Sequence, residues 1–375
     1  MLTGTQIFEI FGYPVDSWSA EACSNMLKCQ CPFMCAECDG GGNRFSSNVS
    51  LTSKHPLHKI FPGRDSIPAG VCSLQLHPGE QPWIVCPRRL LNYRNGADHG
   101  HQKEIKQLLC EKSGLVKGAR YSVWSEVKMK CNVKDGVNTG IFDYTFDYVI
   151  TGRGRRSLAD VCGELGCSER KLAGILTKSG FTICIKDGQT YCDDFPTAPL
   201  VIVEVMTSST CGGNKKSRTQ IAQVFEDTVL KLNGAKVDPG GPSINYRQVW
   251  ARMVSQLLVK SQIGKMWGGV TFWVLQDLLA KYISDTTALD FSDFLAEHSD
   301  EVNIVTGGYG DEIAPENRSG ELAAIRDVKF YSGKVGSSDS EGKTFSDIIK
   351  LGCTPPKSEL TKRLIQKRPC ASFVF

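Results

Sequence analysis

Hydrophobic and polar positions along the chain predict an alternation of strands with helices. Residues 120–133 alternate with the period of a strand, and residues 138–150 are expected to form one or two more. The stretch "PLVIVEVM" at 199–206 is almost continuously apolar, which is typical of a strand buried inside a sheet. This order predicts an α/β fold in which a mixed central sheet is flanked by helices. Helical spacing is found at 101–113, 214–234 and 245–265, and a strand followed by a helix is expected over 268–283.

Two short helices are expected to interrupt this pattern at residues 157–180. They meet at "LGCS", where Ser168 is expected to cap the second helix and Glu169 to favour its start through the helix dipole. An Asp-Gly turn between alternating segments follows, and the basic stretch "GRGRR" at 152–156 precedes as a hinge suited to phosphates. Two interpretations stand side by side, a helix-turn-helix with a small wing and a helical hairpin inserted for packing.

Composition limits the broad class of the protein. A chain of 375 residues with 41% hydrophobic residues can bury a sizeable core and is expected to form roughly two or three domains. The net charge of +4 does not by itself indicate a partner. No apolar run is long enough to span a membrane, and the first residues do not resemble a signal peptide, so a cytoplasmic location is expected.

Cysteine usage points to a metal site near the N-terminus. The chain has 16 cysteines, and without an export signal metal binding and ordinary buried thiols are expected in preference to disulfides. Four of them crowd into "CQCPFMCAEC" between prolines and glycines, which is poor periodicity for a core segment. Buried free thiols are the other interpretation. Six thiols compete for the four positions of a tetrahedral site, and the favoured set is Cys31, Cys38, Cys72 and Cys86, with Cys35 as the alternative to Cys38 and Cys29 as the remaining candidate.

Two acidic residues lie against hydrophobic strands, Asp147 in "FDYVI" and Glu204 in "VEVM". If their strands are neighbours in one sheet, their carboxylates can hold a divalent ion such as magnesium, which prefers hard oxygen ligands. Asp143 competes with Asp147, because the context "FDY" fits both. A polar side chain is expected two residues after the second acid, on the same face of the strand, but Met206 occupies that position.

Taken together, these motifs resemble the NotI family of type II restriction endonucleases, a branch of the PD-(D/E)xK nuclease superfamily. The matching pieces are "CPF", "GVC", "WIVCPRRLL", "FDYVI", "VEVMT" and "QVWARMVSQLLVKSQIGKMWGGVTFWV", in this order. The resemblance implies a nuclease core with an N-terminal four-cysteine knuckle, which binds iron in that family. Its metal here could be iron or zinc, since thiolates suit both.

Carried over residue by residue, the resemblance assigns the catalytic aspartate to Asp147 and the glutamate to Glu204. It also implies that Glu126 corresponds to an additional acid of the family. The four metal-binding cysteines of the family fall on Cys31, Cys38, Cys72 and Cys86.

This chain departs from the family in two respects. The polar residue of the family is a glutamine, whereas a thioether at Met206 is at best a weak acceptor. Lys215, Lys216 or Gln220 from the next helix are the candidates to replace it. The segment 153–195 has no counterpart in the family and is expected to leave and re-enter the sheet near its DNA-facing edge.

The implied function is a magnesium-dependent endonuclease that cuts both strands of a specific duplex site. It would act as a homodimer beside a cognate DNA methyltransferase of a restriction-modification system. The alternative is a sequence-specific or modification-specific DNA-binding protein built on a decayed nuclease core.

The chain is expected to divide into six segments. They are 1–28 (an N-terminal helical segment), 29–95 (the cysteine metal-binding region), 96–152 and 196–290 (the two parts of the nuclease core), 153–195 (the helix-turn-helix-like insert) and 291–375 (a C-terminal region).

Overall fold

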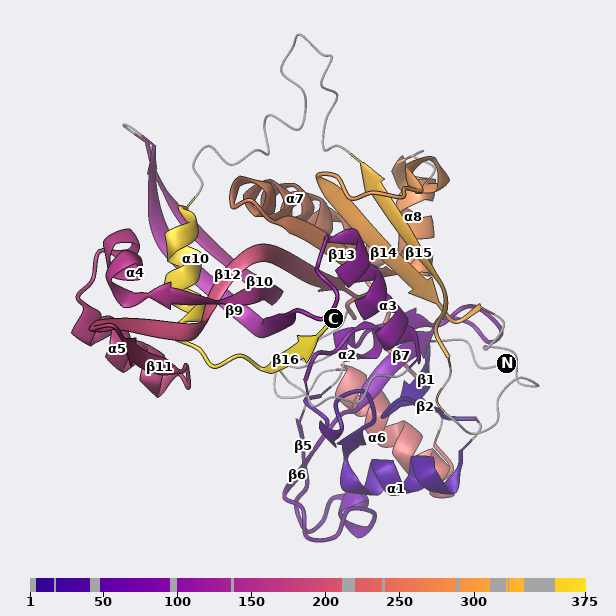
Figure 1. Ribbon diagram of the computed structural model, residues 1–375. Helices are drawn as coiled ribbons and strands as arrows, with labels where there is room; N and C mark the ends of the chain where they lie inside the picture. The colour runs from indigo at the N-terminus through magenta and orange to yellow at the C-terminus, as the bar shows by residue number, and fades with distance from the viewer. Residues whose placement is uncertain are drawn as a thin grey trace.

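A mixed sheet forms the centre of the protein (Figure 1). The computed structural model describes residues 5–16, 18–40, 48–94, 100–135, 138–210, 220–237, 240–287, 291–310, 322, 324–333 and 355–375. The strands of the central sheet are β9 (Arg120–Asp135), β10 (Asn138–Ser157), β11 (Ile183–Lys186), β12 (Gln189–Met206), β13 (Val270–Gln276), β14 (Val302–Gly308), β15 (Arg326–Gly333) and β16 (Ala371–Val374). The helices are α1 (Ala20–Lys28), α2 (Pro87–Leu90), α3 (Gly100–Lys112), α4 (Leu158–Leu165), α5 (Glu169–Lys178), α6 (Gln220–Leu232), α7 (Tyr246–Met266), α8 (Asp277–Thr287) and α10 (Lys357–Leu364), with short 3-10 turns at Pro56–Lys59 and Phe291–Phe294.

The strand order is β15-β14-β13-β12-β10-β9-β16, and β11 pairs with β12. β13 runs parallel to both of its neighbours, whereas the other pairs are antiparallel. The expected mixed sheet of an α/β fold is therefore confirmed. β14, β15 and β16 extend the same sheet, so the C-terminal region predicted at 291–375 contributes to the core.

Helices cover both faces of this sheet, because alternate side chains of its central strands are apolar on each side. On one face, Ile105 of α3 packs in a buried cluster with Val203 of β12. On the other face, Ile263 of α7 packs with Ile202 and with Val149 of β10. The predicted helices at 101–113 and 245–265 are thus confirmed with shifts of one residue at each end, and 268–283 forms β13 and α8 as expected. Of the helix predicted at 214–234, α6 accounts for Gln220–Leu232, and residues 214–219 lie outside the described residues.

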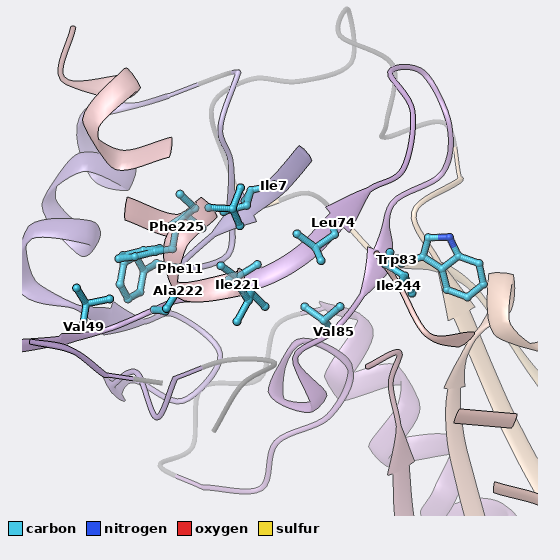
Figure 2. Close-up of a cluster of buried hydrophobic side chains, with 14 of the residues drawn as sticks. Ile7, Phe11, Val49, Leu74, Trp83, Val85, Ile221, Ala222, Phe225 and Ile244 are labelled. Atoms are coloured by element: carbon cyan, nitrogen blue, oxygen red, sulfur yellow. The ribbon is translucent and has the colours of Figure 1, made fainter. Parts of the chain in front are cut away.

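A second, smaller sheet lies beside the first and is formed by N-terminal strands. Its order is β2-β1-β7-β8, and α6 packs against it through a buried cluster (Figure 2). The rings of Phe11 and Phe225 meet edge to face at 6.0 Å in this cluster. The predicted helical segment at 1–28 is wrong in part, since two strands precede α1. The strands are β1 (Gln6–Ile10), β2 (Tyr13–Pro14), β7 (Val71–Gln75) and β8 (Trp83–Ile84), and two further hairpins pair β3 (Gln30–Cys31) with β4 (Ala36–Glu37) and β5 (Asn48–Ser50) with β6 (Ser66–Pro68).

A buried charged network ties the two sheets together. Arg89 Nη2 donates to Glu9 Oε1 at 3.0 Å, and neither side chain is exposed. The hydroxyls of Tyr309 and Ser73 donate to Glu9 Oε2 at 2.6 and 2.8 Å. Because Glu9 lies on β1 and Tyr309 directly follows β14, this network fixes the N-terminal sheet to the end of the central sheet. Buried charges of this kind are tolerated only when paired and hydrogen-bonded.

The stretch 152–156 is part of β10, so the prediction of a basic hinge there is wrong. β10 continues to Ser157 and pairs with β12 up to Tyr191, with register shifts at Gly152 and Gly154. A Cβ at Gly152 would lie 2.4 Å from the carbonyl oxygen of Ala198, which leaves no room for a side chain. Close strand contact, and not flexibility, therefore explains this glycine.

The insert consists of α4, α5 and the β11–β12 hairpin, as the sequence predicts. Ser157 Oγ accepts from the backbone N–H of Asp160 and caps α4. Ser168 occupies the N-cap of α5, but its side chain makes no cap hydrogen bond, so that part of the prediction is wrong. Ser157 lies ten residues beyond Asp147 along β10, about 33 Å at the usual rise of a strand. The insert therefore leaves the sheet far from the two acids along the strand, and its expected place near a DNA-facing edge stays a prediction.

Candidate functional site

Pairing of β10 with β12 places the two predicted acids side by side. Tyr148 pairs with Val203, so Asp147 and Glu204 are the next opposite residues on the two strands. The backbone N–H of Val205 donates to Asp147 Oδ2 at 2.9 Å, which holds the aspartate against β12. Directly opposite residues of an antiparallel pair lie close enough for their side chains to interact.

Asp143, the competitor of Asp147, lies elsewhere. Its carboxylate is exposed and pairs with Lys130 Nζ at 3.1 Å, on the part of the β9–β10 hairpin that extends past the end of β12. It is four residues from Asp147 along β10 and does not oppose Glu204. The geometry therefore favours Asp147.

A buried lysine that the sequence analysis missed completes the pair. Lys260 Nζ lies 2.5 Å from Glu204 Oε2 and donates to the carbonyl oxygen of Thr145 at 2.8 Å, and only 3% of the residue is exposed. Lys260 comes from the middle of α7, seven residues after buried Met253 and three before buried Ile263. It therefore lies on the apolar face of the helix. A lysine at a core position of an amphipathic helix was the signal available in the sequence.

The electrostatics of Glu204 follow from its burial. Burial raises the pKa of Glu204 to about 8, the charge of Asp147 adds to the rise, and the ammonium of Lys260 opposes it. Glu204 Oε1 is buried and has no hydrogen-bond partner among the described residues. A carboxylate oxygen without a partner, beside a second carboxylate, suits a hard divalent cation.

Met206 does not contribute a polar group to this site. Its side chain is partly buried against the apolar cluster shared by α6 and the N-terminal sheet. Among the predicted substitutes, Lys215 and Lys216 lie outside the described residues, as does the side chain of Gln220. The cation beside Glu204 is instead the ammonium group of Lys260, which comes from α7.

Glu126, the additional acid implied by the resemblance, lies on β9 opposite Asp147. Its φ of 52° is left-handed, which is costly for a non-glycine residue in a strand and is often found at functional sites. Arg88 Nη2 lies 3.7 Å from Glu126 Oε1, and Arg88 Nη1 donates to the hydroxyl of Tyr148 at 2.9 Å. Arg88 Nε also donates to Asp39 Oδ2 at 3.3 Å. Since Arg88 is only 4% exposed, these partners fix its guanidinium near Glu126.

Several cysteines near the N-terminus lie together in the fold. Cys31 of β3, Cys72 of β7 and Cys86, which follows β8, are buried in one cluster with Phe33 and Met34, and Cys38 packs against it partly buried. The β7–β8 hairpin supplies two of them, because the backbone N–H of Cys86 donates to the carbonyl oxygen of Cys72 at 3.2 Å. Cys35, in contrast, is exposed, and Cys29 belongs to a different cluster. Cys31, Cys72 and Cys86 are therefore buried together, and Cys38 packs both against them and against the cluster that contains Cys29. Which four thiols would bind a metal stays a prediction.

The chemistry of this donor set fits a borderline metal ion such as zinc or iron. Burial raises the pKa of the Cys31 thiol to about 12 and that of Cys38 well above its ordinary value, and the other thiols of the cluster add to both shifts. A hydrogen bond from Cys72 lowers the pKa of Cys86. Among the described residues, no group of three histidine, cysteine or acidic side chains has an arrangement that could hold a metal ion. Metal binding by these cysteines thus stays a prediction.

Comparison of the chain with family models, with curated proteins and with solved structures finds no match. In the described part of the chain, no helix has both the length and the apolar character needed to cross a membrane.

Cys72→Ser is expected to lower bound transition metal and thermal stability together, because assembly of a structural thiolate site is linked to folding. Elemental analysis and thermal unfolding of protein purified without chelator are the measurements. Cys23→Ser, outside the cluster, is the control and should change neither. Wild-type protein with no transition metal would contradict the site.

Glu204→Gln is expected to change how stability depends on pH. Glu204 keeps its proton up to pH about 8 in the folded protein, against an ordinary pKa of 4.5 in the unfolded chain. Between these values the folded state binds more protons. The stabilising contribution of Glu204 is therefore present at low pH and is lost as pH rises through 8, by at most about 1.4 kcal/mol per pH unit.

Urea unfolding of wild type and variant, below, within and above this window, measures the effect. The unfolding free energy of Glu204→Gln should rise relative to that of the wild-type protein as pH rises. Glu164→Gln, on the surface of α4, should show no such trend. A constant difference for Glu204→Gln would show that the carboxyl is not protonated by burial.

Proposed function

We propose that the protein is a magnesium-dependent endonuclease of the type II restriction class, which hydrolyses phosphodiester bonds in both strands of duplex DNA. The observation that supports this most is the group formed by Asp147, Glu204 and Lys260. Two carboxylates and one lysine, all fixed by strands or by a buried helix face, are what metal-assisted hydrolysis of a phosphodiester requires.

Each side chain has a distinct part in this proposal. Asp147, held by the N–H of Val205, and Glu204, through its Oε1, would hold the magnesium ion. When bound, the ion supplies an acidified water and neutralises charge on the phosphate. Lys260 limits repulsion between the carboxylates and keeps Glu204 oriented through its contact at 2.5 Å. Because its Nζ already contacts Glu204 and two of its three N–H groups are used, Lys260 has one N–H left to donate to the attacking water or to a phosphate oxygen in place of the glutamine that Met206 replaces.

The cysteine cluster would be structural in this proposal. It would hold zinc or iron and fix the short helix α2 that carries Arg88. Cutting both strands of a duplex requires two such sites, so we infer a homodimer. A cognate methyltransferase would be needed to protect host DNA if the protein belongs to a restriction-modification system.

A second candidate is a DNA-binding protein on a decayed nuclease core. It is favoured by Met206, which packs into an apolar cluster, and by the two-helix insert with its hairpin. Incubation of supercoiled plasmid with magnesium separates the two. Discrete fragments support the nuclease, and a gel shift without cleavage supports the binding protein.

Asp147→Asn and Glu204→Gln are each expected to abolish cleavage while leaving DNA affinity within about tenfold, because they remove a metal ligand and not a base contact. Plasmid cleavage and fluorescence anisotropy measure the two effects. Asp143→Asn is the matched control and should still cut. If Asp143→Asn is inactive and Asp147→Asn cuts normally, the role of ligand belongs to Asp143.

Lys260→Met is expected to slow single-turnover cleavage by about 10²–10³-fold, since a positioned donor at the reacting phosphate is lost. Lys265→Met is the control on the same helix, because Lys265 is exposed and pairs with Glu301. Met206→Gln should cut within a few-fold of wild type, because Lys260 already fills the role. A large gain from Met206→Gln together with normal cleavage by Lys260→Met would assign the role to residue 206.

A further inference from the structure

The three arginines of "GRGRR" have different partners in the structure. Arg155 Nε lies 2.5 Å from Asp193 Oδ1, and Arg156 Nη2 lies 2.5 Å from Glu164 Oε1, so both charges are paired. Arg153 instead donates from Nε to the hydroxyl of Ser122 at 2.5 Å. Among the described residues it has no ion pair with a carboxylate. The positive charge of Arg153 is therefore not neutralised by a carboxylate of the described residues and can bind an anion.

A second arginine shares the cavity beside Arg153. This cavity has a volume of about 290 Å³, and its lining includes Arg153, Arg368, Gly180 and Ser372. Arg368 follows α10 and, like Arg153, forms no ion pair with a carboxylate in the described part of the chain. Asp194 also lines the cavity, but its Oδ1 accepts the backbone N–H of Thr182 at 2.9 Å. The cavity thus has an excess of positive charge.

We propose that Arg153 and Arg368 hold a backbone phosphate of duplex DNA, at a distance from the bond that is cut. Two guanidinium groups in one polar cavity match the acceptors of a phosphate group. The cavity falls just below the range of about 300–1,000 Å³ typical of small-molecule sites, so a phosphodiester fits it better than a whole nucleotide.

The place of the cavity relative to the acids supports DNA as the source of the phosphate. Lys367, the neighbour of Arg368, donates from Nζ to the carbonyl oxygen of Glu126 at 3.2 Å, at the level of Asp147. Ser122, which Arg153 contacts, lies four residues from Glu126 along β9, about 13 Å away. Arg153 itself lies six residues beyond Asp147 along β10, about 20 Å away. At about 3.4 Å per base pair, the bound phosphate would lie roughly four to six steps from the scissile one. This inference rests on the proposed function for the position of the cut, but DNA binding can be tested without cleavage.

The test is the salt dependence of binding to a duplex of arbitrary sequence, measured by anisotropy without divalent ions. Arg153→Gln and Arg368→Gln should each weaken binding at low salt, about three- to tenfold, and reduce the slope of log K against log salt by about 0.9. Because both arginines serve one phosphate, the double variant should lose no more slope than either single variant. Arg155→Gln removes the same charge from the same strand and should leave the slope closer to that of wild type.

Other outcomes would overturn the inference. Unchanged slopes in both single variants, or absence of duplex binding by the wild-type protein, would do so even if plasmid cleavage with magnesium is observed. Saturable binding of inorganic phosphate that is lost in Arg368→Gln, with duplex binding unaffected, would show a site for a free anion. Conversely, the expected slopes in a protein that never cuts DNA would support this contact while contradicting the proposed nuclease activity.

Discussion

Antiparallel pairing of β10 with β12 is the contact on which the rest of the arrangement depends. The ladder continues from Tyr148 and Val203 to Ser157 and Tyr191, and the two glycines in its middle allow the strands to approach closely. At one end it places Asp147 beside Glu204, and at the other it carries the two-helix insert. A slip of one residue would move Glu204 from the face covered by α7 to the opposite face, because side chains alternate along a strand. The register of this single pair of strands therefore decides whether a site exists.

Burial of charge at that site is balanced by a cation from α7. Glu204 is almost fully enclosed, and a buried carboxylate next to another acid would be strongly unfavourable alone. Lys260 offsets part of this cost at a distance of 2.5 Å, yet one carboxylate oxygen of Glu204 keeps no partner among the described residues. Such an arrangement is poorly suited to stability alone, since an apolar replacement of a buried pair is often no less stable. The presence of this pair in a core position agrees with the proposed metal-dependent role.

Side-chain contacts of Arg88 link the cysteine cluster to Glu126. Arg88 stands two residues after Cys86, and its partner Asp39 directly follows Cys38, so both ends of this contact are anchored at the cluster. Arg88 contacts Asp39 through Nε, and it contacts Tyr148 through Nη1 and Glu126 through Nη2. A change in the geometry of the thiols would therefore reach the strained backbone of Glu126.

By itself the sequence determined the nature of the elements and most of the chemistry. Period-two and helical patterns predicted β9, α3, α7, β13 and α8, because these segments bury one face each. Acids embedded in apolar strands and crowded cysteines are local signals, and the structure brings Asp147 to Glu204 and four of the six cysteines together.

The remaining features depended on tertiary structure alone. Lys260 reaches Glu204 across a separation of 56 residues in the sequence, and no local pattern states which helix face meets which strand. "GRGRR" was predicted to be a basic hinge, whereas it lies in β10, and its two glycines contact Ala198 and Thr197 across the sheet. The N-terminal strands were missed for the same reason, since short strands are stabilised by distant partners such as β7 and not by their own composition.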